Sequence, residues 1–110
     1  GRIVRPWLGV RYVTLSERLA QTEGLSVSQG ALVIESDEPG VTAVIAGGPA
    51  DKAGIRSHDI ITQVNTVMLS EINTLGGVIT RFRAGETVKL KIVRDGKKIT
   101  VPVLLEEYKE

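Results

Sequence analysis

Trp7-Leu8-Gly9-Val10 is the stretch that decides how the rest of the chain is interpreted, and it leads directly into Arg11-Tyr12-Val13. Gly9 can take a positive φ and lets another backbone approach closely. Such a turn can direct successive N–H groups into one small space, which forms a nest for an anion such as a carboxylate. The start of an ordinary buried strand with a glycine bulge is the alternative that these residues leave open.

The segment after Gly9 is β-prone, and at the edge of a sheet it would accept a partner strand. The two features together would hold the free C-terminus of an extended peptide, with the carboxylate in the nest and the peptide backbone along the strand. Residues 3–13 are expected to form one strand, because Pro6 is compatible with an edge strand or with the first position of a strand.

Length and composition describe a small globular domain. The chain has 110 residues, with 42% hydrophobic and 25% charged, which favours one domain with a modest core over a disordered chain. A net charge of +1 gives no strong field toward nucleic acid or an anionic membrane. No apolar run approaches the roughly 18 residues of a membrane helix. We therefore expect no nucleic-acid partner and no direct membrane insertion, and any targeting signal is expected on a longer parent protein.

The residue types needed for catalysis or metal binding are scarce. The chain has no cysteine and a single histidine, which excludes a cysteine nucleophile and argues against a zinc site. Ser57-His58-Asp59 holds the residue types of a catalytic triad. Side chains of consecutive residues diverge, however, and a triad needs Ser and Asp on opposite sides of the imidazole. We predict no catalytic residue, no metal and no cofactor in this chain.

Two short helices are expected from their end signals. Ser16 is expected to cap a helix over residues 17–23 that ends at Gly24. Pro at the first helical position predicts a single turn over residues 49–53, which Gly54 closes.

Several segments are predicted to form strands. The mostly apolar run 30–35 and the run 59–65 are expected to be central strands. Residues 36–40 form a strong turn signal before the β-prone run 41–46, so residues 31–46 are expected to form a hairpin. Asp95-Gly96 lies between two runs of alternating apolar and polar residues, which is the strongest hairpin signal in the chain.

A longer helix is predicted to begin at Ser70 or Asn73 and to continue to about Arg83. Its apolar positions recur at spacings of four and three and therefore share one face: Leu75, Ile79 and Phe82, with Val78 beside them. A plain core face and a ligand groove are both compatible with that spacing. Gly76 and Gly77 cost about 0.5–1 kcal/mol each relative to Ala, so we expect a frayed or mobile first turn.

Four features stand in a fixed order along the chain. They are residues 7–10, residues 48–55 (Gly-Pro-Ala-Asp-Lys-Ala-Gly-Ile), residues 59–65 (Asp-Ile-Ile-Thr-Gln-Val-Asn) and residues 85–88 (Gly-Glu-Thr-Val) before the 94–97 hairpin. This series resembles a PDZ domain of the circularly permuted bacterial type. More narrowly, it resembles the PDZ domain that follows the protease domain in high-temperature-requirement (HtrA-type) serine proteases, and the segment from Arg5 to Val10 is the most telling part.

The resemblance covers nearly the whole chain and implies a fold. That fold is α+β and rich in strands: a partly open PDZ-like β-barrel or sandwich of about six strands, with one longer groove helix and two short helices. Residues 1–110 are expected to be a single PDZ domain and a fragment of a longer multidomain protein.

The resemblance also implies the site residues. The family binds extended peptides, chiefly free C-termini, by adding a strand between the edge strand and the longer helix. By matching motif, the carboxylate-binding N–H groups are those of Leu8, Gly9 and Val10, and the ladder with the ligand involves Val10, Arg11 and Tyr12. The hydrophobic pocket would consist of Leu8, Val10, Leu75, Val78, Ile79 and Phe82. Leu75 would face the ligand's third-from-last residue and favour an apolar side chain there over Ser or Thr.

This sequence departs from the family pattern at three places. His58 precedes Asp59 where the family usually has Gly, so that turn is expected to need a different backbone conformation. Thr66 follows Asn65 where Gly is usual, so a tight type I′ turn is not expected there. Gly76-Gly77 weakens the groove helix.

The function implied by the resemblance is peptide binding without catalysis. The chain would be the PDZ domain of an HtrA-like serine endoprotease outside the cytoplasm, periplasmic or membrane-tethered, whose catalytic domain is not in this sequence. Its partners would be C-terminal or extended peptides with apolar last and third-from-last residues, and the protease domain of the parent protein. The alternative is an assembly domain whose edge strand and groove hold a neighbouring subunit.

Overall fold

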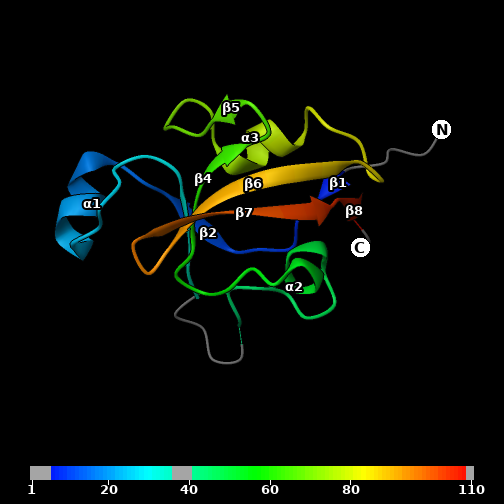
Figure 1. The fold of residues 1–110 in the computed structure, drawn as a ribbon, viewed down its shortest axis with the longest axis horizontal. Coiled ribbons are helices and arrows are strands. Elements are labelled where there is room, and N and C mark those ends of the chain that lie inside the picture. Colours follow the sequence, from blue (N-terminus) through cyan, green and yellow to red (C-terminus); the bar gives the residue numbers. More distant parts are fainter. Residues whose placement is uncertain (1–5, 36–40, 109–110) are drawn as a thin grey trace.

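Two antiparallel sheets and three short helices make up residues 6–35 and 41–108, the part of the chain that the computed structural model describes (Figure 1). The strands are β1 Pro6–Trp7, β2 Tyr12–Thr14, β3 Ala31–Val33, β4 Ile60–Val64, β5 Val67–Met68, β6 Thr87–Arg94, β7 Lys97–Leu104 and β8 Glu106–Glu107. The helices are α1 Glu17–Glu23, α2 Pro49–Ala53 and α3 Leu75–Ile79. The predicted strand-rich α+β class is confirmed.

The larger sheet has the strand order β2-β3-β4-β6-β7, with β5 paired to β4, and the smaller sheet pairs β1 with β8. The larger sheet is open and does not close into a barrel, so β2 and β7 are its ends. In the view of Figure 1, α3 and α2 lie on opposite sides of the β6–β7 hairpin and α1 lies at one end of the molecule.

The β6–β7 hairpin forms as its sequence predicts. The register runs without a break from the pair Thr87 and Leu104 to the pair Arg94 and Lys97. Asp95 and Gly96 have φ values of +52° and +77°, and positive φ at both central residues is the requirement of a type I′ turn.

The prediction of one strand over residues 3–13 is wrong in its described part. The chain forms β1, leaves the strand conformation at Leu8 and Gly9, and resumes it in β2. Gly9 has a φ of +82°, which redirects the backbone from the small sheet to the large one. Apolar patterning does not register such a change of backbone direction.

The prediction of a hairpin over residues 31–46 is also wrong. Its turn, residues 36–40, lies outside the described residues. The segment after it approaches the start of β2: Val44 forms an isolated antiparallel bridge with Val10. The Arg11 N–H donates to the Ala43 carbonyl at 2.7 Å. Propensity identified a β-prone run, but tertiary context selected its partner.

Both predicted short helices are confirmed. At α1, the Ser16 hydroxyl accepts a hydrogen bond from the Leu19 N–H at 3.2 Å, and Gly24 ends the helix with a φ of +65°. At α2, Pro49 begins the helix and Gly54 ends it with a φ of +88°.

The predicted bounds of the longer helix are wrong at both ends. Thr74 is the N-cap of α3, because its hydroxyl accepts from the Gly77 N–H at 3.2 Å. The Ser70 hydroxyl closes the preceding turn by accepting from the Asn73 N–H at 3.1 Å. After Ile79 the chain continues in three-residue turns as far as Phe82, whose N–H donates to the Ile79 carbonyl at 3.1 Å. These turns maintain the apolar spacing beyond the helix.

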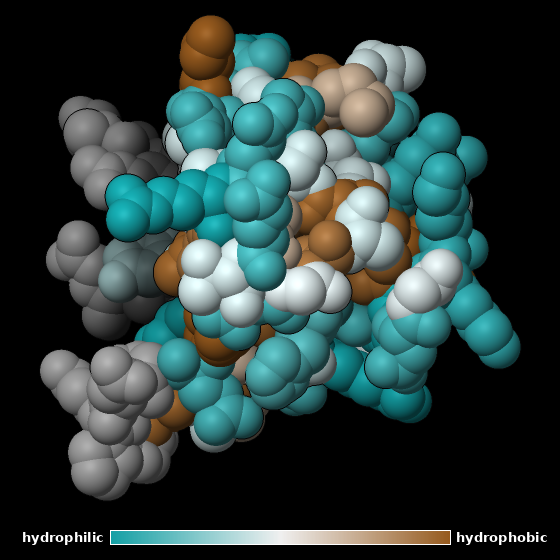
Figure 2. Space-filling view, turned by 90° about the vertical axis from the view of Figure 1, so that its left-hand side faces the viewer, coloured by the Kyte–Doolittle hydropathy of each residue, from teal (hydrophilic) through white to brown (hydrophobic). Residues whose placement is uncertain are grey.

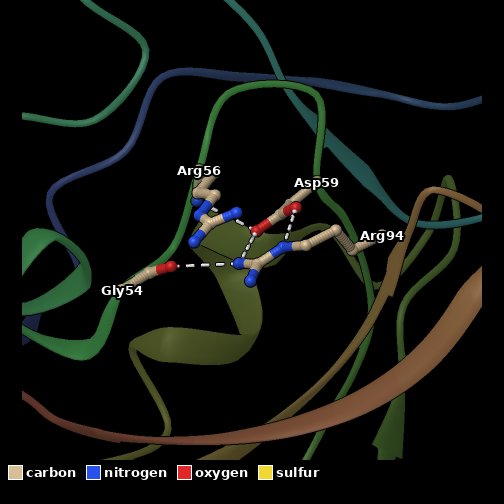
Figure 3. Close-up of polar contacts among 4 residues, drawn as sticks. All are labelled: Gly54, Arg56, Asp59 and Arg94. Atoms are coloured by element: carbon tan, nitrogen blue, oxygen red, sulfur yellow. Dashed lines mark hydrogen bonds and ion pairs between the residues drawn. The ribbon is translucent and has the colours of Figure 1, made fainter.

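An ion pair between the half-buried Arg94 and the buried Asp59 fixes the turn that leads into β4 (Figure 3). Asp59 is 1% exposed, and its two carboxylate oxygens accept hydrogen bonds from Arg94 Nε at 2.9 Å and Nη2 at 2.7 Å. The carboxylate also accepts from the Arg56 N–H, and Arg94 Nη2 donates to the Gly54 carbonyl at 3.0 Å. The hydrogen bonds that Arg94 donates to the Asp59 carboxylate raise the pKa of Arg94 above its ordinary value.

His58 and Thr66 stand at turn positions where glycine is usual in the family, and their backbone conformations differ. His58 has a φ of +72°, a left-handed conformation that favours glycine. Asn65 has a φ of +52° but Thr66 does not have a positive φ, so the β4–β5 turn is not of type I′, as predicted.

Figure 2 shows the end of the molecule that carries α1: hydrophilic side chains cover most of it, around a hydrophobic area near its centre. Within the described ranges, no helix has the length and apolar character needed to span a membrane.

Candidate functional site

The turn at Leu8, Gly9 and Val10 presents unused backbone donors. The Leu8 carbonyl accepts from the Ala50 N–H at 2.8 Å, and the Gly9 carbonyl accepts from the Ile45 N–H at 2.9 Å. Among residues 6–35 and 41–108, no hydrogen bond uses the N–H groups of Leu8, Gly9 or Val10. Successive free N–H groups around a glycine of positive φ are the components of an anion-binding nest.

The turn rests against the start of α2. A Cβ added to Gly9 would lie 3.5 Å from Gly48 Cα and from Pro49 Cδ, and one added to Gly48 would lie 3.3 Å from the Trp7 indole. The Trp7 ring also meets the Tyr108 ring edge to face, with centroids 5.8 Å apart. Trp7 therefore packs against its own domain, and this packing holds the turn in place.

The outer edge of β2 is unpaired in the described sheet. The Arg11 N–H and carbonyl both point into the domain, because they bond to Ala43 at 2.7 Å and to Ile34 at 3.1 Å. Backbone groups of successive strand residues point to opposite sides, so those of Val10 and Tyr12 point away from β3. Arg11, which was expected to pair with a ligand, thus lies between the two residues that form the open edge.

The six predicted pocket residues come together in one apolar cluster. Leu8, Leu75, Val78 and Ile79 are buried members of the main core, each 5% exposed or less. Val10 and Phe82 are half-buried and pack against that core. These two therefore carry most of the apolar surface that remains for contact with a ligand.

A contact across this site was not predicted from the sequence. The Tyr12 hydroxyl, on β2, accepts a hydrogen bond from the Gly76 N–H of α3 at 2.8 Å. Sequence reasoning assigned Tyr12 a backbone role alone and treated Gly76 as a weak point of the helix. The usable signal was the glycine itself, because glycine within a helix often marks a close approach of another group.

Ser57, His58 and Asp59 do not converge in the way that a catalytic triad requires. The Ser57 hydroxyl lies 3.2 Å from His58 Nδ1, but the Asp59 carboxylate is directed to Arg94. In the described part of the chain, no three His, Cys, Asp or Glu side chains are grouped as a metal site would require.

The described residues also form a hollow of about 670 Å³ away from the predicted site. It lies between the 26–29 loop and strands β4 to β7, and polar side chains such as Lys91, Lys98 and Thr100 share its wall with Met68 and Ile99. None of the predicted site residues lines it.

Comparison with known families gives a match over nearly the whole chain. The family model described as "PDZ domain" matches residues 6–105. A protein of Marinomonas sp. (strain MWYL1) named "Probable periplasmic serine endoprotease DegP-like" is 36% identical over 96% of this chain and 21% of its own length. A protein of the same name from Chlamydia trachomatis serovar D is 37% identical over 94% of this chain and 19% of its own length. The chain thus spans about a fifth of the curated relatives it matches.

Solved structures show the same fold. The chain superposes on "HtrA-type protease AlgW with decapeptide" with a TM-score of 0.79 and 24% identity, covering 100% of this chain and 31% of that one. It superposes on the HtrA3 PDZ domain bound to the phage-derived ligand FGRWV with a TM-score of 0.74 and 20% identity, covering 98% of this chain and 91% of that one.

Proposed function

The chain belongs to the PDZ domain family, and from that premise we propose that residues 1–110 are a single peptide-binding PDZ domain of a longer protein. The observation that supports this function best is the combination at one place of three unused N–H groups, an unpaired strand edge and an apolar cluster. The proposed ligand is an extended peptide with a free C-terminus.

The carboxylate of the peptide would be held by the N–H groups of Leu8, Gly9 and Val10. An anion accepts hydrogen bonds from such a nest without needing a basic side chain. These donors are already fixed by the packing of the turn on α2, so little ordering is needed on binding.

The peptide backbone would extend the larger sheet beyond β2. Val10 and Tyr12 would supply the N–H and carbonyl groups of the new ladder, with Arg11 between them facing the domain. The last side chain of the peptide would enter the apolar cluster against Val10 and Phe82. We propose apolar side chains at the last and third-from-last positions, the latter near Leu75 at the start of α3.

Such a module binds weakly, on the order of micromolar, because a short added strand buries little area against the cost of ordering the peptide. Its role belongs to the longer protein. The curated relatives are named periplasmic serine endoproteases, so the parent is proposed to be an HtrA-like protease outside the cytoplasm. Peptide binding to this domain would tether a substrate or shift the protease between states.

The proposal is tested by titrating the ¹⁵N-labelled domain with a six-residue peptide that ends in valine. Amide signals of Gly9, Val10 and Tyr12 should move most. Phe82→Ala should weaken binding about tenfold, because a half-buried aromatic contact is lost. Leu104→Ala is the matched control, since Leu104 is exposed and lies on β7. Changes confined to the amide signals of residues that line the 670 Å³ hollow would contradict the proposal.

A further inference from the structure

We infer that the Tyr12 side chain limits the size of the ligand's third-from-last residue, so that the domain accepts small side chains there and rejects large ones. This inference rests on the proposed function and adds to it a selecting residue. It reconciles the apolar surroundings of Leu75 with a hydroxyl that lies in the same region.

The first step is the position of Tyr12. The residue lies on β2, it is half-buried, and its ring packs against the main core. Its hydroxyl reaches the N–H of Gly76 in the first turn of α3, at 2.8 Å. The side chain therefore extends from the open edge strand to the helix on the other side of the proposed groove.

The second step is the space at Gly76, the residue that the Tyr12 hydroxyl contacts. A Cβ added to Gly76 would lie 2.8 Å from the Tyr12 hydroxyl, closer than a side-chain carbon is found to an oxygen. Glycine at this position is thus what admits the tyrosine. The neighbouring Gly77 differs, because a Cβ there would lie 3.2 Å from the Thr74 hydroxyl and would not meet Tyr12. The pair of glycines that weakened the predicted helix therefore includes one with a specific contact.

The third step is the register of an added strand. The nest precedes β2, so a peptide whose C-terminus lies in the nest runs antiparallel to β2. Its last residue then lies beside Val10 and its third-from-last residue lies beside Tyr12, because side chains recur on one face every two residues. The third-from-last side chain and the Tyr12 ring therefore compete for the space between β2 and the start of α3.

The Tyr12 ring, which occupies that space in the free domain, is held in place. The hydrogen bond to Gly76 anchors the end of the ring and the core packs against its body, so a large ligand side chain must displace it or leave the groove. Forcing extra methylene groups into such a packed space is unfavourable. A small apolar side chain such as that of alanine fits beside the ring without moving it.

The test compares two free-acid peptides of six residues, identical except that one ends in Ala-Ser-Val and the other in Leu-Ser-Val. The wild-type domain should bind the alanine peptide about tenfold more tightly or better, as measured by fluorescence anisotropy. Equal affinity for the two peptides overturns the inference and leaves the proposed function intact. Failure to bind either peptide overturns both.

Two pairs of variants assign the selectivity to Tyr12. Tyr12→Ala should bring the affinity ratio to about one or reverse it, while Val13→Ala should keep the wild-type ratio because Val13 lies on the other face of β2 and is 39% exposed. A full wild-type ratio in Tyr12→Ala overturns the inference.

The second pair does not truncate the core. Gly76→Ala places a methyl group against the Tyr12 hydroxyl and should release the ring and lower the ratio, whereas Gly77→Ala adds the same group to the same turn and should not. If Tyr12→Ala fails to fold, this comparison decides: equal ratios in the two alanine variants of α3 overturn the inference.

Discussion

At the residue scale, His58 occupies a backbone conformation that favours glycine, with a φ of +72°. A left-handed conformation costs a residue with a Cβ about 1–2 kcal/mol. His58→Gly removes that cost but increases the freedom of the unfolded chain by roughly 0.4–1 kcal/mol. We expect a net gain of about 0.5 kcal/mol, or a few degrees in Tm, measured by thermal unfolding.

The reverse substitution is the control for this effect. Gly24 ends α1 with a φ of +65° and has open space around a built Cβ, so Gly24→Ala meets no atom and tests the backbone term alone. It should lower stability by about 1 kcal/mol. A His58→Gly variant less stable than wild type would show that the His58 side chain contributes more than its backbone costs.

Arg94 is the residue whose removal should be most costly among the polar contacts described above. Arg94→Ala leaves the Asp59 carboxylate, 1% exposed, without its two charged hydrogen bonds. Because the Arg94 side chain is itself 23% exposed, water partly replaces it, and we expect a loss of about 2–3 kcal/mol in chemical denaturation.

Arg94→Lys is the conservative comparison. Lysine keeps the charge but cannot reproduce the planar two-nitrogen contact, so the loss should be smaller but measurable. Since the pKa of Arg94 is raised, its contribution is present below the unfolded-state pKa and is lost only as the pH rises through the still higher folded value. Arg94→Ala with wild-type stability would contradict the importance of this pair.

At the element scale, the predictions succeeded where a few adjacent residues determine the structure. Ser16 with Gly24, Pro49 with Gly54, and Asp95-Gly96 each carry the chemistry of a cap or a turn, which acts within a few residues. These signals need no knowledge of the rest of the chain.

Most of the predictions that failed concern features that adjacent residues do not determine. The partner of segment 41–46, the break at Gly9 and the contact of Gly76 depend on residues far away in sequence, whereas the cap of α3 is a local feature of Thr74 for which Ser70 or Asn73 was predicted instead. Val44 pairs with Val10 because both lie beside the same core, and Gly76 is explained by Tyr12, which lies 64 positions earlier. The likeness to a family was enough to predict that the six pocket residues come together in one apolar cluster, but not the side-chain contact between Tyr12 and Gly76.

The cap of α3 gives a prediction at this scale. Thr74→Ala removes the hydroxyl that accepts from Gly77 and should cost about 1 kcal/mol of stability. It should also weaken peptide binding, because α3 lines the proposed groove. Ser16→Ala, at the corresponding cap of α1, should cost a similar amount of stability and leave peptide affinity unchanged. Peptide affinity is measured by calorimetric titration. Equal effects of the two variants on that affinity would contradict the claim that α3 lines the groove.

At the scale of the whole molecule, the open sheet is what makes a binding edge available. Strands β3, β4 and β6 each have a neighbouring strand on both sides. Strand β2 has a neighbour on one side only, and its other edge lies next to the nest and the apolar cluster. The same arrangement would also serve a neighbouring subunit in an assembly. Recognition of a terminal carboxylate separates the two uses, because an assembly contact needs no chain end.

The most direct measurement is a calorimetric titration of the domain with one valine-ending peptide in two forms, as the free acid and as the C-terminal amide. A nest of three N–H groups binds an anion, and the neutral amide replaces one acceptor oxygen with a donor that faces those groups. We predict binding on the order of micromolar for the acid and a loss of at least about a hundredfold for the amide, since hydrogen bonds to a charged group contribute more than neutral ones. Equal affinity for the two forms would contradict carboxylate recognition at Leu8, Gly9 and Val10.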